Sequence, residues 1–315
     1  MRNSLLLISF FVLLFTACRN IPPGSNTLLS TKELETTTYN INISEDNTIF
    51  SKYGAVINIP AGAIVSDTGM VTIEVTEVYT INDMVKAGLN TQSNGLPLVS
   101  CGMIYIGARR SAEVLTTISA YIPTTAKRKN MDVYTGYADN LGNMNWRNPG
   151  PLNKYERTGE VNTTQAVDRV VSGQLLSPQN DTLDYYYFST TALGWYSVGK
   201  VTKGQAGFEQ STLDATVSGS GTAQLNVYLV IPSEKIFLAG GPARGKQNTY
   251  AFFTDDSKIL LPQNKKAYIL AMSETDGAVL LGAAEFTTSR EQNVEVEVST
   301  SDKEQLARVI SLVAE

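Results

Sequence analysis

Apolar and polar residues alternate along most of this chain with a period of two. The alternation begins near Tyr39 and recurs in short segments that end at Gly, Pro, Asn or Asp. Period-two spacing in segments rich in Val, Ile, Thr and Tyr predicts half-buried β-strands. A first series comprises residues 39–43, 54–59, 70–78, 103–108, 117–122 and 131–137, and a second comprises residues 223–231, 249–254, 266–272, 279–287 and 294–298.

Many short strands separated by turn residues predict an all-β protein built as a sandwich or barrel. The chain has 315 residues, which ordinary domain sizes divide into two domains. A hydrophobic content of 43% is enough for two cores. We therefore expect two β-sandwich-like domains in tandem, at residues 37–203 and 204–298.

Two segments have helical rather than alternating spacing. One is NDMVKAG at residues 82–88, and the other is the C-terminal segment 299–315. In the second, Ser301 and Glu304 have the spacing of a capping box at a helix N-terminus. The apolar face of this helix would consist of Leu306, Val309, Ile310 and Val313.

The N-terminus has the pattern of a secretory signal peptide over residues 1–17. Arg2 precedes an apolar run from Leu5 to Phe15, which is too short to cross a membrane as a helix. Residues 18–36 contain Pro22-Pro23-Gly24 and no sustained apolar period, so we expect a flexible tether there.

Cys18 follows the small residues Thr16 and Ala17, and this arrangement resembles the lipobox of bacterial lipoproteins. The resemblance implies that Cys18 carries the lipid and holds the protein in the cell envelope, because two or more acyl chains anchor stably. An ordinary signal peptide with an incidental cysteine is the alternative. Arg19-Asn20 lacks the aspartate associated with inner-membrane retention, which favours the outer membrane and leaves its periplasmic and surface sides open.

The composition excludes several kinds of chemistry. The chain has no histidine, which removes Ser-His-Asp and Cys-His catalysis and histidine-containing zinc sites. Cys101 lies in the apolar context VSCGMIYI and is expected to be a buried small side chain rather than a nucleophile. The formal net charge of −5 is spread along the chain, so a nucleic-acid partner is not expected.

The acidic pairs give no metal or catalytic signal. Glu45-Asp46, Asp255-Asp256 and Asp181 with Asp184 lie among turn-forming residues, where solvated turns are expected. Residues 139–146, DNLGNMNW, are expected to form a β-turn rather than a cation site. No catalytic residue, metal or cofactor is predicted, and a paired-carboxylate glycosidase cannot be recognised from spacing alone.

Residues 240–247, GGPARGKQ, almost match a phosphate-binding loop. Such a loop needs backbone amides at the start of a helix and a Ser or Thr after the lysine. Here Gln247 follows Lys246, Pro242 removes an amide, and the next residues alternate like a strand. We therefore expect a mobile hairpin loop and no nucleotide.

Aromatic residues are the strongest candidates for a ligand-binding surface. In a strand, Tyr185 and Tyr187 face one side while Tyr186 and Phe188 face the other. One of these faces is core. The other is expected at an interface between packed parts of the protein, or alternatively as a platform that stacks on sugar rings, with Trp146 and Trp195 as further members.

The segment YGAVINIPAGAIVSDTGMVTIEVTEV, residues 53–78, resembles the opening of ZU5 domains. Residues 89–108, the MDVYTGYADNLGNMNW block and LGWYSVGK at residues 193–200 are similar to uncharacterised bacterial lipoproteins with a ZU5-like N-terminal half. The resemblance implies that residues 37–203 form a ZU5-like β-sandwich that binds other proteins. Self-cleaving ZU5 members break a His-Phe-Ser sequence, and Tyr187-Phe188-Ser189 would be its counterpart here. Tyrosine replaces the histidine, and a phenol does not readily act as a general base at neutral pH.

These observations lead to one expectation and two alternatives. We expect a lipid-anchored envelope protein, not an enzyme, that acts as a protein-interaction module. The first alternative is glycan binding through exposed aromatic side chains, and the second is self-cleavage between Phe188 and Ser189.

Overall fold

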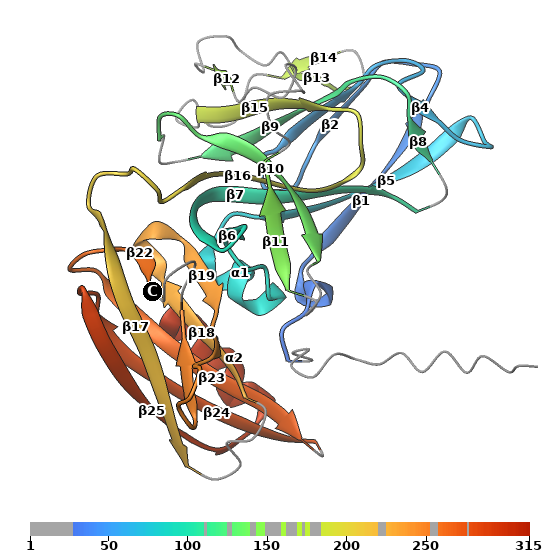
Figure 1. The fold of residues 1–315 in the computed structure, drawn as a ribbon. Coiled ribbons are helices and arrows are strands. Elements are labelled where there is room, and N and C mark those ends of the chain that lie inside the picture. The colour runs from blue at the N-terminus through green and yellow to red at the C-terminus, as the bar shows by residue number, and fades with distance from the viewer. Residues whose placement is uncertain are drawn as a thin grey trace, which may run out of the picture.

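The computed structural model describes residues 28–109, 112–124, 128–138, 143–148, 159–161, 169–171, 174–176, 184–219, 225–252, 258–275 and 277–315. Strands dominate these residues, and the helices among them are short. The fold is all-β with a short helix near the C-terminus, which confirms the predicted fold class (Figure 1).

Two sheets formed by the N-terminal part of the chain pack face to face as a sandwich (Figure 1). Along the first sheet the order is β1 (Thr36–Asn42), β5 (Met70–Val78), β7 (Leu96–Ala108), β16 (Gly194–Val201), β10 (Asp132–Ala138) and β11 (Met144–Arg147), with β6 (Gln92–Ser93) paired to β7. Along the second it is β12 (Gly159–Val161), β15 (Asp184–Thr190), β9 (Ile118–Thr124), β3 (Val56–Ile59) and β2 (Asn47–Phe50). Short ribbons pair β4 (Ile64–Val65) with β8 (Glu113–Val114) and β13 (Arg169–Val171) with β14 (Gln174–Leu176).

Aliphatic and aromatic side chains fill the space between these two sheets. Ile73 and Ile104 of the first sheet meet Ile57 and Phe188 of the second, and all four are fully buried. Each such side chain stabilises the fold by about 1.5–3 kcal/mol relative to an exposed one. The period-two pattern therefore marks real core positions in this part of the chain.

The C-terminal part of the chain forms a third, strongly curved sheet. Its order is β19 (Ile236–Ala239), β18 (Asn226–Ile231), β23 (Lys266–Thr275), β24 (Ala278–Thr287), β25 (Glu291–Ser301), β17 (Phe208–Gly219), β21 (Thr249–Ala251) and β20 (Gly241–Pro242), with β22 (Ile259–Pro262) also paired to β17. The strands at the two ends of this order, β19 and β20, are neighbours in sequence and are joined at Gly240. One continuous segment therefore supplies both edge strands of the sheet. This brings the two edges close together and curls the sheet almost into a barrel.

The interior of this barrel-like sheet is apolar. Leu229 and Ile269 lie inside it with no exposed surface, and alternate valines of β25 join them while the glutamates between those valines face outward. Strand β17 runs parallel to β25, whereas its pairings with β21 and β22 are antiparallel.

A shared core joins the sandwich to the third sheet. Helix α1 (Ile81–Ala87) lies between them in Figure 1. Met103 and Trp146 from the outer face of the first sheet belong to the same apolar cluster as Tyr228 and Leu270 from the outer face of the third. Helix α2 (Lys303–Val313) adds Leu306, Ile310 and Val313 to it. Burial on both sides explains the continuous apolar runs in β18 and β23.

Helix α2 confirms the predicted terminal helix but not its predicted cap. The residue that caps the N-terminus is Asp302, whose Oδ1 accepts a hydrogen bond from the Gln305 N–H at 2.6 Å. Ser301 is instead the last residue of β25, where the ladder with β24 holds its backbone in the strand. The capping-box prediction was therefore one residue too early.

The predicted tether was also too long. Residues 1–27 lie outside the described part, but Leu29 is buried in the shared core and Thr31–Glu33 forms a 3₁₀ turn, η1. The Ser30 N–H donates to the Lys86 carbonyl at 3.0 Å. Gly88, in the left-handed conformation with φ 67°, ends α1 directly beneath Leu29, where a Cβ would lie 3.3 Å from the leucine Cβ. The isolated leucines of this segment are thus packing residues.

Several strands lie outside the predicted segments, including β2, β16, β19 and β22 as well as β17 and β11. Strand β17 buries Leu213, Ala215 and Val217, but its intervening Ser, Thr and Asp residues weaken the apolar pattern. Residues 144–147 form β11 rather than the end of a β-turn, because Trp146 pairs opposite Gly136. Residues 139–142 lie outside the described part.

Candidate functional site

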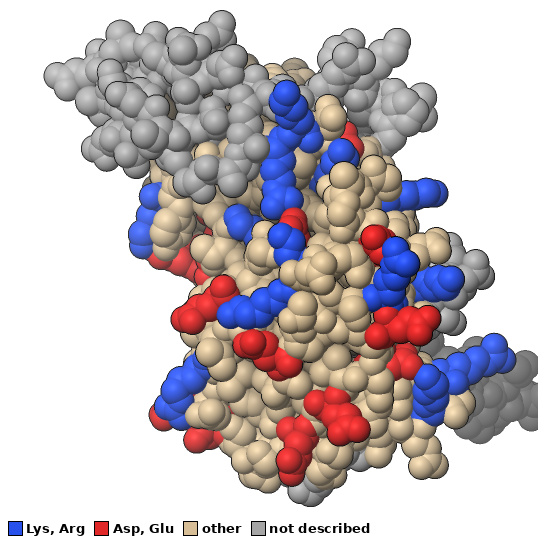
Figure 2. All heavy atoms as spheres, turned by 90° about the vertical axis from the view of Figure 1, so that its left-hand side faces the viewer, with Lys and Arg blue, Asp and Glu red and all other residues tan. Residues whose placement is uncertain are grey.

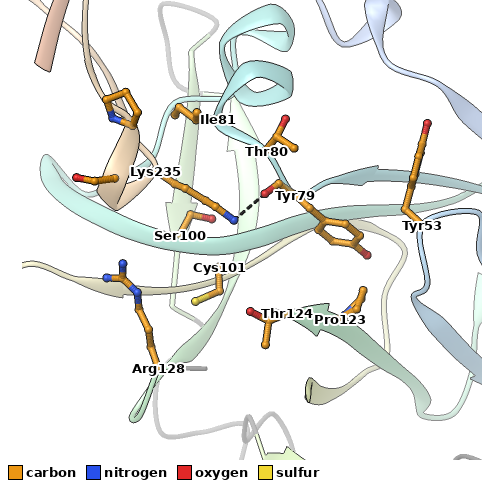
Figure 3. Close-up of a pocket in the computed structure, with 12 residues that line it drawn as sticks. Tyr53, Tyr79, Thr80, Ile81, Ser100, Cys101, Pro123, Thr124, Arg128 and Lys235 are labelled. Carbon is orange, nitrogen blue, oxygen red and sulfur yellow. Dashed lines mark hydrogen bonds between the residues drawn. The ribbon is translucent and has the colours of Figure 1, made fainter. Parts of the chain in front are cut away.

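An open pocket of about 520 Å³ lies where the sandwich meets the third sheet, and we call it the junction pocket. Its walls come from the connection between β5 and α1, from β7, from the end of β9 and from the 3₁₀ turn η2 (Pro232–Glu234), with Tyr53 at one end (Figure 3). Concave sites of this size between packed parts of a protein are common places for ligand binding.

A β-bulge in β7 forms one wall of the junction pocket. Val198 of β16 pairs with Gly102 and Gly199 pairs with Ser100, so Cys101 has no partner in this ladder. A bulge bends its strand and changes the direction of its side chains. It brings both Ser100 and Cys101 to the pocket lining, whereas successive residues of a regular strand face opposite sides.

Cys101 is a free thiol that is 6% exposed, which confirms the prediction of a buried small side chain. The thiol donates a hydrogen bond to the Tyr186 hydroxyl at a distance of 3.6 Å. Burial raises the pKa of this thiol, and the Tyr186 hydrogen bond and the charges of Arg128 and Lys235 oppose that rise with smaller effect. The thiol is therefore protonated at neutral pH and is a poor nucleophile.

Lys235 carries an ammonium group from the third sheet into the junction pocket. The residue ends η2 in the left-handed conformation, with φ 49°, and its backbone N–H donates to the Pro232 carbonyl. Its Nζ donates to the Tyr79 carbonyl at 2.7 Å, across to the sandwich (Figure 3). Burial lowers the pKa of this ammonium, and the charge of Arg128 lowers it further against an opposing effect of Cys101.

Arg128 supplies a second cation to the same region. Its Nη1 lies 2.9 Å from Glu234 Oε2, and Lys265 Nζ lies 3.8 Å from Glu234 Oε1. The backbone of Arg128 is held by Tyr186, whose hydroxyl accepts from the Arg128 N–H at 2.7 Å and donates to its carbonyl at 3.1 Å. One carboxylate thus serves two cations, while Lys235 adds a third.

The buried carboxylate of Glu77 holds the other end of the junction pocket. It accepts hydrogen bonds from Ser51 Oγ, the Tyr53 N–H, the Ala55 N–H and the Tyr79 hydroxyl, at 2.7–3.1 Å. Burial, with the nearby negative charge of Glu77, raises the pKa of Tyr79 well above its usual value. The Tyr79 phenol therefore stays protonated, while the Tyr53 side chain remains 50% exposed.

The two predicted tryptophans lie together, inside the shared core rather than on an open surface. Trp146 has no exposed surface, and its indole N–H donates to the Asn90 carbonyl at 2.6 Å. Trp195 is half-buried, and its ring centroid lies 5.4 Å from that of Tyr105. Gly136 lies close to both residues, since a Cβ there would be 2.8 Å from the Trp195 Cβ and 2.9 Å from Cζ3 of the Trp146 indole.

The predicted tyrosines lie on the other sheet. Tyr185 is buried and Tyr187 is half-buried, with its ring centroid 5.0 Å from that of Tyr121. Tyr186 and Phe188 occupy the sandwich core, as their alternation required. The four candidate aromatic residues therefore form no common groove.

The Phe188–Ser189 bond lies within the regular pairing of β15 with β9, where Ser189 is opposite Ser119. The Ser189 hydroxyl is 2.6 Å from the Tyr187 hydroxyl and 3.3 Å from the Ser119 hydroxyl. A phenol is thus hydrogen-bonded to this serine at the position where the self-cleaving motif has its base.

Residues 240–247 contain β20 and most of the turn that joins it to β21, and Lys246 makes an ion pair with Asp214 instead of facing an anion site. A strand, not a helix, follows this loop. Within the described ranges, no group of three or more Cys, Asp or Glu side chains is placed to hold a metal ion. Asp255, Asp256 and Asp181 lie outside those ranges.

Acidic and basic side chains are interspersed over the face of the molecule in Figure 2. This face carries no broad basic surface of the kind that binds nucleic acid. In the part of the chain that the structure describes, no helix has the length and apolar character needed to span a membrane. Cys18 lies outside that part.

The residues of the junction pocket were missed from the sequence, except Cys101, whose burial was predicted. One signal was present for Glu77. Val71, Ile73 and Val75 point into the sandwich core, and the same alternation puts a charged residue, Glu77, on the inward side of the strand. Arg128 and Lys235 carry no comparable signal, because tertiary packing alone brings them together.

No protein-family model matches this chain, and no curated protein is similar to it in sequence.

Proposed function

We propose that this chain is a lipid-anchored protein of the cell envelope that acts as a non-catalytic interaction module, with the junction pocket as its contact point for a partner. The observation that carries the proposal is that both the sandwich and the third sheet line one open pocket. A partner group in this pocket would touch both parts at once and stabilise their packing.

The chemistry of the junction pocket supports binding more than turnover. Burial keeps the Cys101 thiol protonated, and the chain lacks histidine, the commonest general base near neutral pH. The polar groups are also held in place before any ligand arrives, by Glu77 at one end and by the Lys235–Tyr79 hydrogen bond at the other. Preorganisation of this kind lowers the entropic cost of association.

The proposed anchor is the lipid on Cys18, followed by a tether that reaches no further than residue 27. Two or more acyl chains would hold the folded part in the envelope, with the outer membrane as the expected location. A Cys18→Ala variant should take up no radiolabelled palmitate and should keep its signal peptide, whereas the unchanged chain should be labelled and processed. Labelling of the variant, or no labelling of the unchanged chain, would contradict the anchor.

The proposed contact point can be tested in living cells with a photocrosslinking amino acid at position 53, at the exposed end of the junction pocket. The control position is Glu295, on the outward face of β25. We expect a discrete crosslinked adduct from position 53 and none from position 295. Equal adducts at both positions, or none at position 53, would remove the support for this pocket as the contact point.

Glycan binding is the weaker alternative, because Trp146 and Tyr185 are buried and the candidate aromatics lie at separate places. Self-processing is favoured by one contact, the 2.6 Å hydrogen bond between the hydroxyls of Tyr187 and Ser189. Intact mass of the purified mature chain decides this candidate. A break between Phe188 and Ser189 that disappears in a Ser189→Ala variant would establish it, and an unbroken chain would exclude it.

A further inference from the structure

We propose that the junction pocket recognises an organic anion, a carboxylate or phosphate group on an apolar or aromatic body, with Lys235 and Arg128 binding the anion. The inference deepens the proposed function and rests on it, since it assumes that the pocket is the contact point. It adds the chemical class of the group that enters.

The first argument is the incomplete pairing of Lys235. An ammonium group has three N–H donors. In the described part of the chain, the Tyr79 carbonyl is its one hydrogen-bond acceptor and no carboxylate lies within ion-pair distance. A partly buried charge without a counter-charge is costly, and an anion in the pocket would remove that cost.

The second argument is the local excess of positive charge. Glu234 is shared between Arg128 and Lys265, and Lys235 adds a further cation near Arg128. Arg128 contacts Glu234 through Nη1. Among the contacts of the described residues, its other guanidinium N–H groups have no acceptor and can donate to a ligand oxygen. Two cations that repel each other across a concave site favour an anion between them.

The third argument is the division of the junction pocket into two ends. In Figure 3, Lys235 and Arg128 lie toward one end, while Tyr53, the Tyr79 ring and Pro123 lie toward the other. Planar or apolar side chains of this kind pack against a ligand body, and charged groups fix its orientation. A free inorganic ion would use only the charged end.

The binding test uses the full chain in detergent and two isosteric probes, benzoate and benzamide, observed by ligand-detected NMR. Benzoate carries the proposed charge and benzamide does not. We expect benzoate to bind at least about tenfold more tightly, which is the effect of a charge-assisted hydrogen bond. Equal binding of the two probes, or no binding of benzoate, would overturn the inference.

The matched variants are Lys235→Met and Lys265→Met. Both remove one positive charge near Glu234, but only Lys235 lines the pocket. We expect Lys235→Met to weaken benzoate binding at least about tenfold and Lys265→Met to change it by less than about threefold. Equal losses in the two variants would show a general charge effect and contradict direct contact.

A second readout does not depend on a variant that folds. Cys101 lines the junction pocket and is the free thiol of the described chain. Benzoate at saturation should slow alkylation of Cys101 by iodoacetamide, while benzamide at the same concentration should not. Unchanged alkylation under benzoate would place its binding elsewhere and overturn the assignment.

The source of the anion is resolved by comparing a short peptide that has a free C-terminal carboxylate with the same peptide amidated, beside phenyl phosphate. Preference for the free-acid peptide identifies a chain terminus of a protein partner, and preference for phenyl phosphate identifies a phosphorylated ligand. Both support the inference. If position 53 crosslinks to a partner but no anion competes, the interaction proposal survives and the anion assignment fails.

Discussion

The side of the sandwich that faces the junction pocket and the interior of the C-terminal barrel differ in what they bury. The first contains Ser51, Glu77 and Ser100 among its buried polar residues, whereas the barrel interior is formed mainly by Leu, Ile, Val, Ala and Phe side chains, with Ser211 as the buried polar residue on the inward face of β17. Both are built from strands of similar alternation. The alternating pattern therefore predicts which residues face inward. A charged residue at an inward position, such as Glu77, marks a place where buried side chains have a role besides stabilising the fold.

Buried polar groups favour one geometry, because each has to meet its hydrogen-bond partner. Glu77 meets four donors and so fixes the loop of Ser51–Ala55 and the Tyr79 ring. The side chains of an apolar interior have no such partners to meet. Their packing therefore tolerates small changes in position more easily. We therefore expect the barrel to carry most of the stability and the pocket wall to carry the specificity.

The largest expected effect is in the barrel. Leu229→Ala removes a fully buried side chain that lies between Leu238 and Ile269 in the sheet, so it should cost about 2–5 kcal/mol of unfolding free energy. Denaturant unfolding measures this loss. Val65→Ala, at a side chain that is 45% exposed, is the control and should change stability by less than about 0.5 kcal/mol. Similar losses in both variants would remove the contrast.

A smaller effect is expected at Glu77, which supports Tyr53 and Tyr79 of the pocket lining. Glu77→Gln keeps the shape but turns one acceptor into a donor that faces other donors, which should cost about 1–3 kcal/mol. Glu35→Gln is the control, since Glu35 pairs with Lys52 at the surface and such pairs contribute little. Thermal unfolding measures both, and a Glu77→Gln variant as stable as its control would contradict the role of the carboxylate.

The cap of helix α2 gives a paired test at adjacent residues. Asp302→Ala removes the acceptor for the Gln305 N–H and should cost about 1 kcal/mol, whereas Ser301→Ala should change stability by less than about 0.5 kcal/mol. A larger loss of stability in Ser301→Ala than in Asp302→Ala would show that Ser301 caps the helix, as the sequence predicted. Because α2 belongs to the shared core, a loss at Asp302 would also loosen the junction between the two parts.

The last prediction concerns rate rather than stability. The raised pKa of Cys101 means that its thiolate fraction is lower than that of a free thiol at neutral pH and increases only at more alkaline pH. The ratio of its alkylation rate to that of glutathione should therefore rise between about pH 7 and about pH 10. A ratio that is flat or falls over this range would show that burial does not control the thiol.

The sequence alone indicated many of the longer elements, although not β16, β17, β19 or β22. Val and Ile at every second position define strands wherever they occur, because a pleated strand with one buried face permits no other placement. The β5 segment, residues 70–78, was predicted with its observed bounds, and the helices near residues 82–88 and at the C-terminus were recognised from their spacing. These signals are local, since neighbours a few residues apart produce them.

Only the tertiary structure decided where the candidate site lies. Cys101 and Lys235 are far apart in the chain, and they meet because a bulge in β7 and a left-handed turn after η2 both line the junction pocket. Trp146, one of the predicted aromatic candidates, is instead buried in the shared core. Pairing between distant strands carries no local signature, so composition and spacing could identify aromatic candidates but not the pocket that packing creates.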